Sequence, residues 1–231
     1  EACLHLLSVV NPLDTDLSLV YAPLVPVALY ERMKAVEEEI NAAARELGGS
    51  VLRDDDLLHT NTHLVEYSTV SAGTFDESFL EVPREVLITA MREHQKYFAV
   101  IDAAGKLMPG FVAVNNTRTR DMDLVATGHE RVLRARLSDA RYFYTADVKV
   151  SMEAWVEKLK GVLFQAKLGS MHDKVMRVKN IAGWLADAVN PAEKEKVTRA
   201  AHLCKADLVS QVVGEFAKLQ GVMGRIYATV A

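Results

Sequence analysis

Cysteine is scarce in this chain, which carries only Cys3 and Cys204 among its 231 residues. Two cysteines cannot build a disulfide framework, and they suit a reducing compartment. No apolar run reaches the roughly 18 residues that a membrane-spanning helix needs. The amino terminus also lacks the basic-then-apolar order of a signal peptide. We therefore expect a cytoplasmic protein that does not contact a membrane.

The chain also lacks a strong excess of charge of either sign. Its formal net charge is −4 and its pI is near 6.0. Half of the residues are apolar and a quarter are charged, which is typical of a globular protein. Since no overall positive field draws in nucleic acid, any binding of RNA or DNA would depend on local basic patches.

Several catalytic signatures are missing as well. The sequence has no GxxxxGK[ST] phosphate loop, no GxSxG nucleophile elbow and no GxGxxG after a predicted strand. Residues Gly221 to Gly224 have the GxxG form that clamps a nucleic-acid backbone in KH domains. The surrounding pattern is not that of a KH domain, so we interpret these glycines as a tight helix connection. The residues alone predict no catalytic site.

The first half of the chain mixes helical and strand periodicity. Residues 1–26 are apolar and interrupted by three prolines, which predicts irregular or extended structure. Helices are predicted over residues 30–47, 54–65 and 83–94, and strands over residues 68–75, 96–102 and 111–115. The last two strands form a predicted hairpin.

Residues 128–146 combine an apolar helical face with an arginine-rich one. At helical spacing, Leu133, Leu137, Ala140 and Tyr144 fall on one side, and Arg131, Arg134, Ser138 and Arg141 fall on the other. One side can pack against a core and the other can hold anions.

Helical periodicity dominates after a linker predicted at residues 145–151. Three helical patterns follow, over residues 152–166, over residues 175–189 and from residue 197 onward. The sequence therefore predicts an α+β chain with a mixed α/β module at residues 1–147 and an all-helical domain at residues 148–231. The abrupt end after Gly224 suggests that the helical domain is truncated.

Two histidine patterns bear on metal binding. His59 and His63 lie four residues apart on a predicted helix, but no third ligand is evident nearby, so we interpret them as ordinary histidines. His172-Asp173 followed by His202 resembles the layout of HD-type phosphohydrolases, where an early histidine and a later His-Asp doublet bind metal. Here Cys204-Lys205 takes the place of the doublet, and a protonated lysine has no lone pair for a cation. We expect no metal site.

Five blocks of the sequence resemble one known family, the beta subunit of the bacterial two-subunit glycyl-tRNA synthetase. They are VPREVLITAMREHQKYFAV, GKLMPGFVAVNN, GHERVLRARLSDARYFY, KLKGVLFQAKLGSMHDKVMRV and KADLVSQVVGEFAKLQGVMGRIYA. The resemblance extends from about Tyr30 to the carboxy terminus and is weaker over residues 1–19.

The resemblance implies a division of labour between two subunits. An alpha subunit activates glycine with ATP and Mg²⁺, and the beta subunit recognises and positions tRNA-Gly. It further implies that residues 1–147 resemble the B3/B4 domain of phenylalanyl-tRNA synthetase and that residues 148–231 form an HD-like domain without its metal motif. The family's anticodon-binding domain would lie beyond Ala231. We expect this chain to bind no cofactor itself and to be inactive alone.

Our first hypothesis is an RNA-positioning part of a synthetase. Its candidate phosphate contacts are Arg131, Arg134, Arg136, Arg141, Lys96, Arg118 and Lys205. Two alternatives stay open, namely an HD-type metal-dependent phosphohydrolase and a scaffold that docks the alpha subunit. It also stays open whether the arginines meet RNA or fasten the two domains together through acidic partners such as Glu130 and Asp139.

Overall fold

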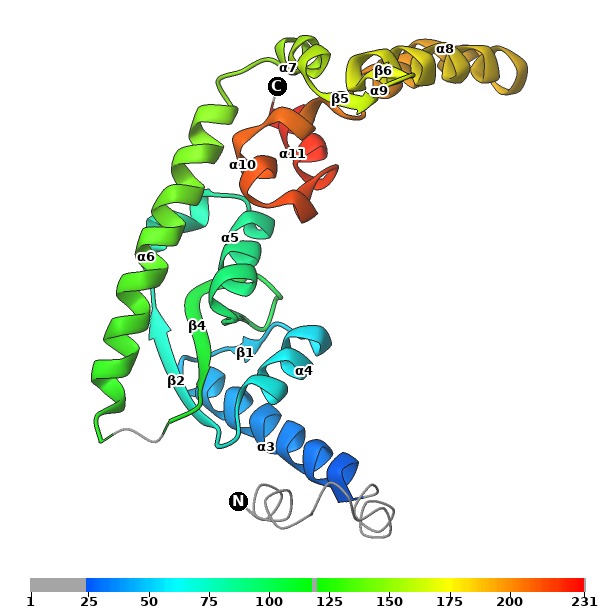
Figure 1. Cartoon of the computed structure of the whole chain (residues 1–231). Helices are drawn as coiled ribbons and strands as arrows, with labels where there is room; N and C mark the ends of the chain where they lie inside the picture. The colour runs from blue at the N-terminus through cyan, green and yellow to red at the C-terminus, as the bar shows by residue number, and fades with distance from the viewer. Residues whose placement is uncertain (1–23, 118–119, 231) are drawn as a thin grey trace. The chain divides into compact units, whose positions relative to one another are not determined.

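The computed structural model describes residues 24–117 and 120–230, which fall into two compact units (Figure 1). The sheet unit holds residues 24–80 and 91–135, and the helical unit holds residues 81–90 and 136–230. Helix α6 (Met122–Asp147) contributes residues to both. The expectations for residues 1–23, including Cys3, and for Arg118 lie outside the described residues. The domain boundary between residues 147 and 148 stays a prediction.

The sheet unit contains one antiparallel sheet of four strands in the order β1-β3-β4-β2. The strands are β1 (Ser50–Val51), β2 (Thr69–Thr74), β3 (Phe98–Ile101) and β4 (Leu107–Asn115). The predicted hairpin is confirmed as β3 and β4, and the predicted strand at 68–75 is confirmed as β2, which pairs with β4 from Thr69–Asn115 to Thr74–Gly110. Strand β1 was not predicted, because two residues carry no periodicity.

Two helices complete this unit, α3 (Leu24–Glu46) and α4 (Asp55–Leu64). Helix α3 packs on the sheet and on α4 through Val36, Ile40 and Ala44, which are all buried. Both predicted helices are confirmed, as is Asp54 as the cap of α4, since its carboxylate accepts the Leu57 N–H. The expectation of irregular structure up to residue 26 is wrong from Leu24 onward. A proline in the first turn of a helix gives up only an N–H that has no intrahelical partner.

The chain leaves α3 through a pair of glycines. Gly48 has a φ of +80°, a left-handed conformation that ends the helix and that glycine adopts without strain. Gly49 lies against the sheet, where an added Cβ would stand 2.6 Å from a Val100 methyl carbon and 2.7 Å from the Ile101 carbonyl oxygen. The close approach of α3 to β3 therefore requires a residue without a side chain at position 49.

We expect Gly49→Ala to destabilise the fold by about 2 kcal/mol, because the added methyl group forces backbone to move in a packed region. The matched control is Gly128→Ala in α6, where an added Cβ meets nothing within 4 Å. That substitution should stabilise the protein by about 0.5–1 kcal/mol through helix propensity. Denaturant unfolding of both variants checks the pair, and equal stabilities would contradict the packing argument.

The helical unit begins with α5 (Arg84–Ala90), and after α6 it continues with eleven further short elements among the described residues. These are α7 (Met152–Lys158), η3 (Leu159–Gly161), β5 (Leu163–Gln165), β6 (Gly169–Ser170), α8 (Met171–Val189), η4 (Pro191–Glu193), α9 (Lys194–Leu203), η5 (Ala206–Val209), α10 (Gln211–Glu215), η6 (Ala217–Leu219) and α11 (Val222–Val230). The 3₁₀ segment η1 (Glu77–Glu81) and the π-helical turn η2 (Met91–Gln95) flank α5.

Two predictions for this unit need correction. The unit is not all-helical, since β5 and β6 form an antiparallel hairpin, and the helix predicted over 152–166 ends at Lys158. Gly161 is a poor helix former, and the apolar residues after it, Leu163 and Phe164, are exposed rather than turned to a core. The predicted helix at 175–189 is confirmed as α8, and the third ends at Leu203, so that Leu208 lies in η5.

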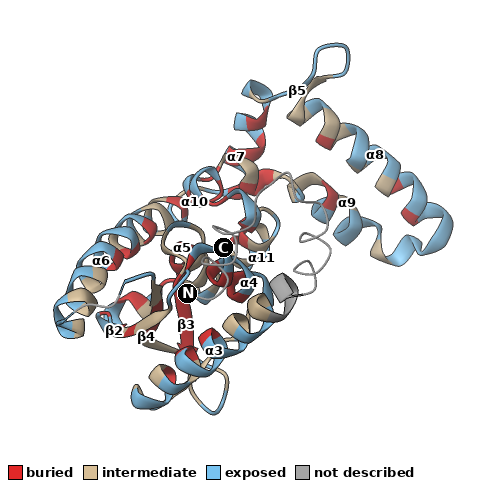
Figure 2. Cartoon of the chain, turned by 60° about the horizontal axis from the view of Figure 1, so that its bottom comes forward, coloured by how far each residue is buried: buried red, intermediate tan, exposed pale blue. Residues whose placement is uncertain are grey.

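Helix α8 is apolar on two sides but buried on only one. Val175, Gly183 and Ala186 are buried, and Gly183 lets Thr198 of α9 approach closely. On the other side Ile181 and Trp184 are 64% and 72% exposed (Figure 2). Helices that are apolar all round are normally buried, so this side is an open apolar surface. Among the described residues, no helix has the length and apolar character needed to cross a bilayer.

Two buried aspartates hold the carboxy-terminal helices. The Asp147 carboxylate accepts the N–H groups of Gln211 and Val212, at the start of α10, and the Tyr227 hydroxyl at 2.8 Å. The Asp207 carboxylate accepts the N–H groups of Gly221 and Gly224, at the start of α11. Both carboxylates therefore meet the positive end of a helix. The interpretation of Gly221 to Gly224 as a tight helix connection is confirmed.

Asp147→Asn should destabilise the protein by about 2–3 kcal/mol, because an amide has only one acceptor oxygen and turns an N–H₂ group toward donors. Asp187→Asn is the control, since Asp187 is exposed and paired with Lys194 on the surface. We expect it to change the stability by less than about 0.5 kcal/mol. Thermal unfolding of both variants measures the difference. If Asp147→Asn lowers the stability no more than Asp187→Asn does, the buried carboxylate is not needed for the stability of the fold.

Candidate nucleic-acid interface

Helix α6 has the two faces predicted from the sequence. Leu133, Leu137 and Ala140 are buried. Arg131 is exposed on the opposite side of the helix, and Arg134 is exposed on one flank of the buried face. The apolar face therefore packs and the arginine face points to solvent.

The four candidate arginines do not share one direction. At about 100° per residue, Arg131 and Arg134 are about 60° apart around α6, whereas Arg136 lies on the other flank of the buried face. Arg131, Arg134 and Arg136 are exposed and Arg141 is half-buried. Arg134 and Arg141 also take part in interactions within the protein. We define the arginine row as Arg131 and Arg134, which both lie in the sheet unit, whereas Arg136 and Arg141 belong to the helical unit.

Polar contacts fix the first half of α6 on the sheet. Glu130 accepts the Thr74 N–H of β2 at 2.8 Å, so its carboxylate is directed to the sheet. His129 is held from both ring nitrogens, with the Tyr97 hydroxyl 2.7 Å from Nδ1 and the Asn115 Oδ1 2.8 Å from Nε2. These contacts set the rotation of α6 about its axis. They thereby set the direction in which Arg131 and Arg134 point.

The hydrogen bonds assign the protons of this network. Asn115 donates its N–H₂ group to the Thr69 carbonyl and the Ser71 hydroxyl, so its Oδ1 faces His129 as an acceptor. His129 then carries its proton on Nε2, and Nδ1 accepts from the Tyr97 hydroxyl. Burial lowers the pKa of His129 and raises the pKa of Tyr97 to about 12. Both groups are therefore held neutral at pH 7.

Protonation of His129 should destabilise the sheet unit. Its pKa in the folded state lies below the ordinary value of 6.5, so the unfolded chain binds the proton more tightly. The contribution to stability is present above the unfolded pKa and is lost as the pH falls from there through the folded pKa. We expect the Tm of the wild type to fall between pH 7.5 and 5.5, and to fall less in His129→Gln. Thermal scans across this range test the prediction. An identical pH dependence in both proteins would contradict it.

The remaining candidates lie elsewhere. Lys96 of the sheet unit has a φ of +59° and donates from Nζ to the Glu93 carbonyl at 2.8 Å, so its ammonium group already has a partner. Lys205 of the helical unit is half-buried just before η5. Arg118 lies outside the described residues. Only the arginine row is thus brought together on one element, and the roles of all seven residues stay predictions.

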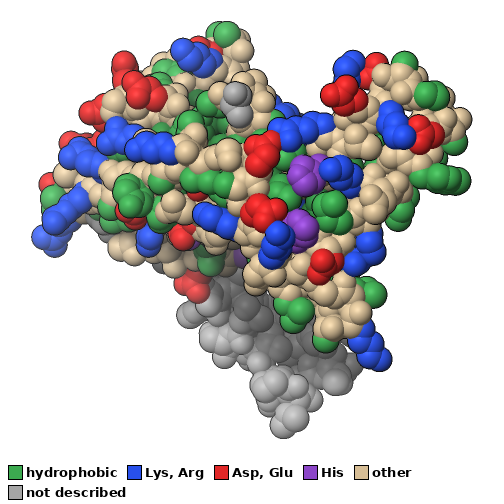
Figure 3. Space-filling view, turned by 90° about the horizontal axis from the view of Figure 1, so that it is seen from above, with side chains coloured by type: hydrophobic (Ala, Val, Ile, Leu, Met, Phe, Trp, Pro, Cys, Tyr) green, Lys and Arg blue, Asp and Glu red, His purple; other side chains and the backbone are tan. Residues whose placement is uncertain are grey.

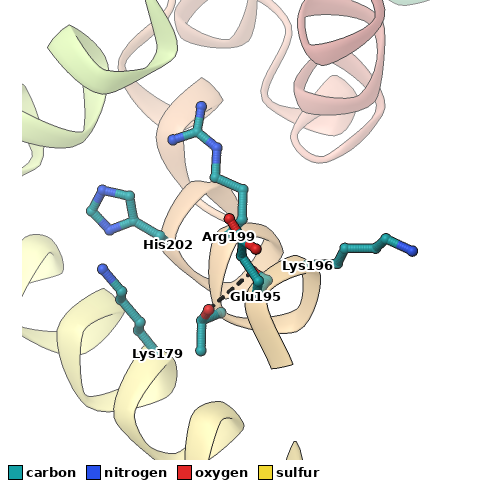
Figure 4. Close-up of a pocket in the computed structure, with 6 residues that line it drawn as sticks. Lys179, Glu195, Lys196, Arg199 and His202 are labelled. Atoms are coloured by element: carbon teal, nitrogen blue, oxygen red, sulfur yellow. Dashed lines mark hydrogen bonds between the residues drawn. The ribbon is translucent and has the colours of Figure 1, made fainter. Parts of the chain in front are cut away.

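A second group of cations was not singled out from the sequence. Lys179 of α8 and Lys196, Arg199 and His202 of α9 line an open pocket of about 600 Å³, together with Glu195 and Thr198 (Figure 4). In the space-filling view, histidine side chains lie beside those of lysine or arginine (Figure 3). The signal in the sequence is the helical spacing, with His172 and Lys179 two turns apart and Arg199 and His202 three residues apart.

The residues that resemble an HD motif do not form a metal-binding set. Asp173 closes a capping box at the start of α8, where its carboxylate accepts the Ser170 N–H at 2.8 Å. This backbone hydrogen bond is the main cause that lowers the pKa of Asp173. Among the described residues, no three histidine, cysteine, aspartate or glutamate side chains cluster closely enough to hold a metal ion. The hydrolase alternative is therefore not favoured.

Comparison with known proteins gives the class of protein, an aminoacyl-tRNA synthetase subunit. A family model described as the glycyl-tRNA synthetase beta subunit matches residues 17–231. The glycine–tRNA ligase beta subunit of Desulfatibacillum aliphaticivorans is 58% identical over 202 residues, which are 87% of this chain and 29% of that protein. The corresponding protein of Geobacter sulfurreducens is 55% identical over 197 residues, which are 85% of this chain and 29% of that protein.

A third relative, from Syntrophus aciditrophicus, is 50% identical over 207 residues, which are 90% of this chain and 30% of that protein. The chain belongs to the glycyl-tRNA synthetase beta subunit family. It spans about three tenths of the length of these relatives.

Proposed function

We propose that this chain recognises and positions tRNA-Gly as part of a glycyl-tRNA synthetase beta subunit. The observation that carries the proposal is the arginine row on α6, in a chain whose relatives are named glycine–tRNA ligase beta subunits. A row of guanidinium groups suits the sugar-phosphate backbone, because each planar fork can donate two hydrogen bonds to one phosphate.

The contacts that hold α6 in place favour this role. Arg131 and Arg134 are separated by about 4.5 Å along the helix axis, so both guanidinium groups can reach the same stretch of sugar-phosphate backbone. Contacts to phosphate fix register and orientation without reading sequence. A rigid helix, held by His129 and Glu130, keeps these cations in place before RNA arrives. Preorganised cations lose little entropy on binding.

The chemistry of glycylation belongs to the complete enzyme. In this proposal an alpha subunit activates glycine with ATP and Mg²⁺, and this chain supplies no catalytic residue. A cytoplasmic location stays a prediction. We also propose that residues 1–147 are a B3/B4-like module and that residues 148–231 are an HD-like domain.

A titration of tRNA-Gly with this chain at several salt concentrations tests the role of the arginine row. We expect Arg131→Ala and Arg134→Ala each to weaken binding, and each to reduce the slope of log K against log salt concentration by about one, since one phosphate contact is lost. Fluorescence anisotropy of labelled tRNA gives both quantities.

The matched control is Arg45→Ala, which removes an exposed arginine from the last turn of α3. It changes the net charge equally and should leave the salt slope unchanged. An unchanged affinity for tRNA-Gly in both α6 variants would contradict the proposal that these arginines contact phosphate. Co-purification with the alpha subunit but no RNA binding would favour the scaffold alternative instead.

A further inference from the structure

The pocket between α8 and α9 gathers positive charge from two helices. Lys179 and His202 point toward one another from the facing helices, and Arg199 lies on the same side of α9 (Figure 4). His172 is two helical turns from Lys179 on α8 and therefore lies on the same side of that helix. The arrangement follows from the close packing of the two helices at Gly183, where Thr198 fits.

Two of the four charged side chains that line the pocket, those of Lys196 and Arg199, already have partners. Lys196 pairs with Glu193 at 2.9 Å and points away from His202 (Figure 4). Arg199 pairs with Glu153 of α7. Lys179 differs, because among the described residues it has no ion-pair or hydrogen-bond partner. Among the residues that line the pocket, its ammonium group and the Glu195 carboxylate are the charges without such a partner.

His202 is also unsatisfied. Its Nδ1 is buried and has no hydrogen-bond partner among the described residues. Buried polar atoms that serve only a structural role are nearly always hydrogen-bonded. Burial lowers the pKa of His202, and the positive charges of Lys179 and Arg199 lower it further. The ring therefore lies in a positive field that an anion would relieve.

We propose that this pocket binds a phosphate group, with Lys179 and His202 as direct contacts and Arg199 at its rim. The pocket is large enough for a phosphate and open to solvent. The Lys179 ammonium, the Arg199 guanidinium and the one N–H of a neutral His202 ring are donors that suit phosphate oxygens. The phosphate can belong to an RNA backbone or to a small phosphorylated molecule. Only the first source depends on the proposed function.

Titration of the 231-residue chain with inorganic phosphate, followed by the NMR signal of the His202 ring, tests the site directly. We expect saturable binding that Lys179→Gln weakens about tenfold, the effect of losing one charged hydrogen bond. Lys179→Arg should retain binding, because the charge is kept. The control Lys196→Gln removes an equal charge from the same pocket and should leave the affinity within about twofold. Circular dichroism shows that each variant is folded.

The His202 signal supplies a second readout. The charged groups around the ring are His172 and Lys179 from α8, Arg199 and Glu195 from α9, and Glu153 and Glu157 from α7. A bound anion opposes the positive members of this set, so it should raise the pKa of His202. By linkage, binding should tighten as the pH falls. Sulfate is the probe for this measurement, since its charge is constant over the range.

Titrations with AMP and with tRNA-Gly distinguish the sources of the phosphate. Displacement of inorganic phosphate by tRNA, weakened by Lys179→Gln, would support an RNA phosphate, and displacement by AMP alone would support a small ligand. If the pocket binds phosphate but the chain does not bind tRNA, the inference about the pocket holds and the proposed function is contradicted. No change in the His202 signal with any probe, or equal weakening in Lys179→Gln and Lys196→Gln, would overturn the inference.

Discussion

The carboxylate of Asp147 is buried at the end of α6, and the last part of the helical unit is organised around it. It accepts two N–H groups at the start of α10 and the hydroxyl of Tyr227 in α11, whose ring packs against Trp155 with centroids 4.8 Å apart. Burial, and then the bond to this carboxylate, raises the pKa of Tyr227, so the hydroxyl stays a donor. A buried charge costs several kcal/mol unless it is satisfied, and here helix N-termini satisfy it. Asp147 thus fixes the start of α10 and, through Tyr227, contributes with Asp207 to the position of α11.

The same helix is fixed at its other half by a different kind of contact. His129 and Glu130 attach it to the sheet through neutral hydrogen bonds and one backbone N–H, within the sheet unit. The direction of the arginine row is a consequence of these attachments, because rotation of α6 would bring Leu133 into water. The candidate interface is thus the face of α6 that stays exposed after the apolar face of the helix has packed. Such a face is rigid because the buried face is rigid.

Periodicity in the sequence predicted the helices and strands whose pattern is set by residues close together in the chain. Helix α6 and the β3–β4 hairpin were found because their apolar residues recur locally at fixed intervals. The short β5–β6 hairpin was missed, since the side chains of β5 are all exposed and β6 has only two residues, so there is no alternation to detect. Asp147 was missed for another reason, because its partners lie 64 to 80 residues away. The arginine row could be predicted as a surface, whereas the pocket at His202 required knowing that α8 packs on α9.

The charge of that pocket decides what it can hold. A divalent cation beside Lys179 and Arg199 would meet like charges. Asp173 is engaged with the Ser170 N–H and Glu153 with Arg199, so the single Glu195 carboxylate is the acidic group that lines the pocket. A metal centre needs deprotonated donors that converge, and a lysine at position 205 cannot be one at neutral pH. The same cations attract an anion, and the unsatisfied nitrogen of His202 adds to the preference. The same local charge therefore disfavours a metal ion and favours an anion.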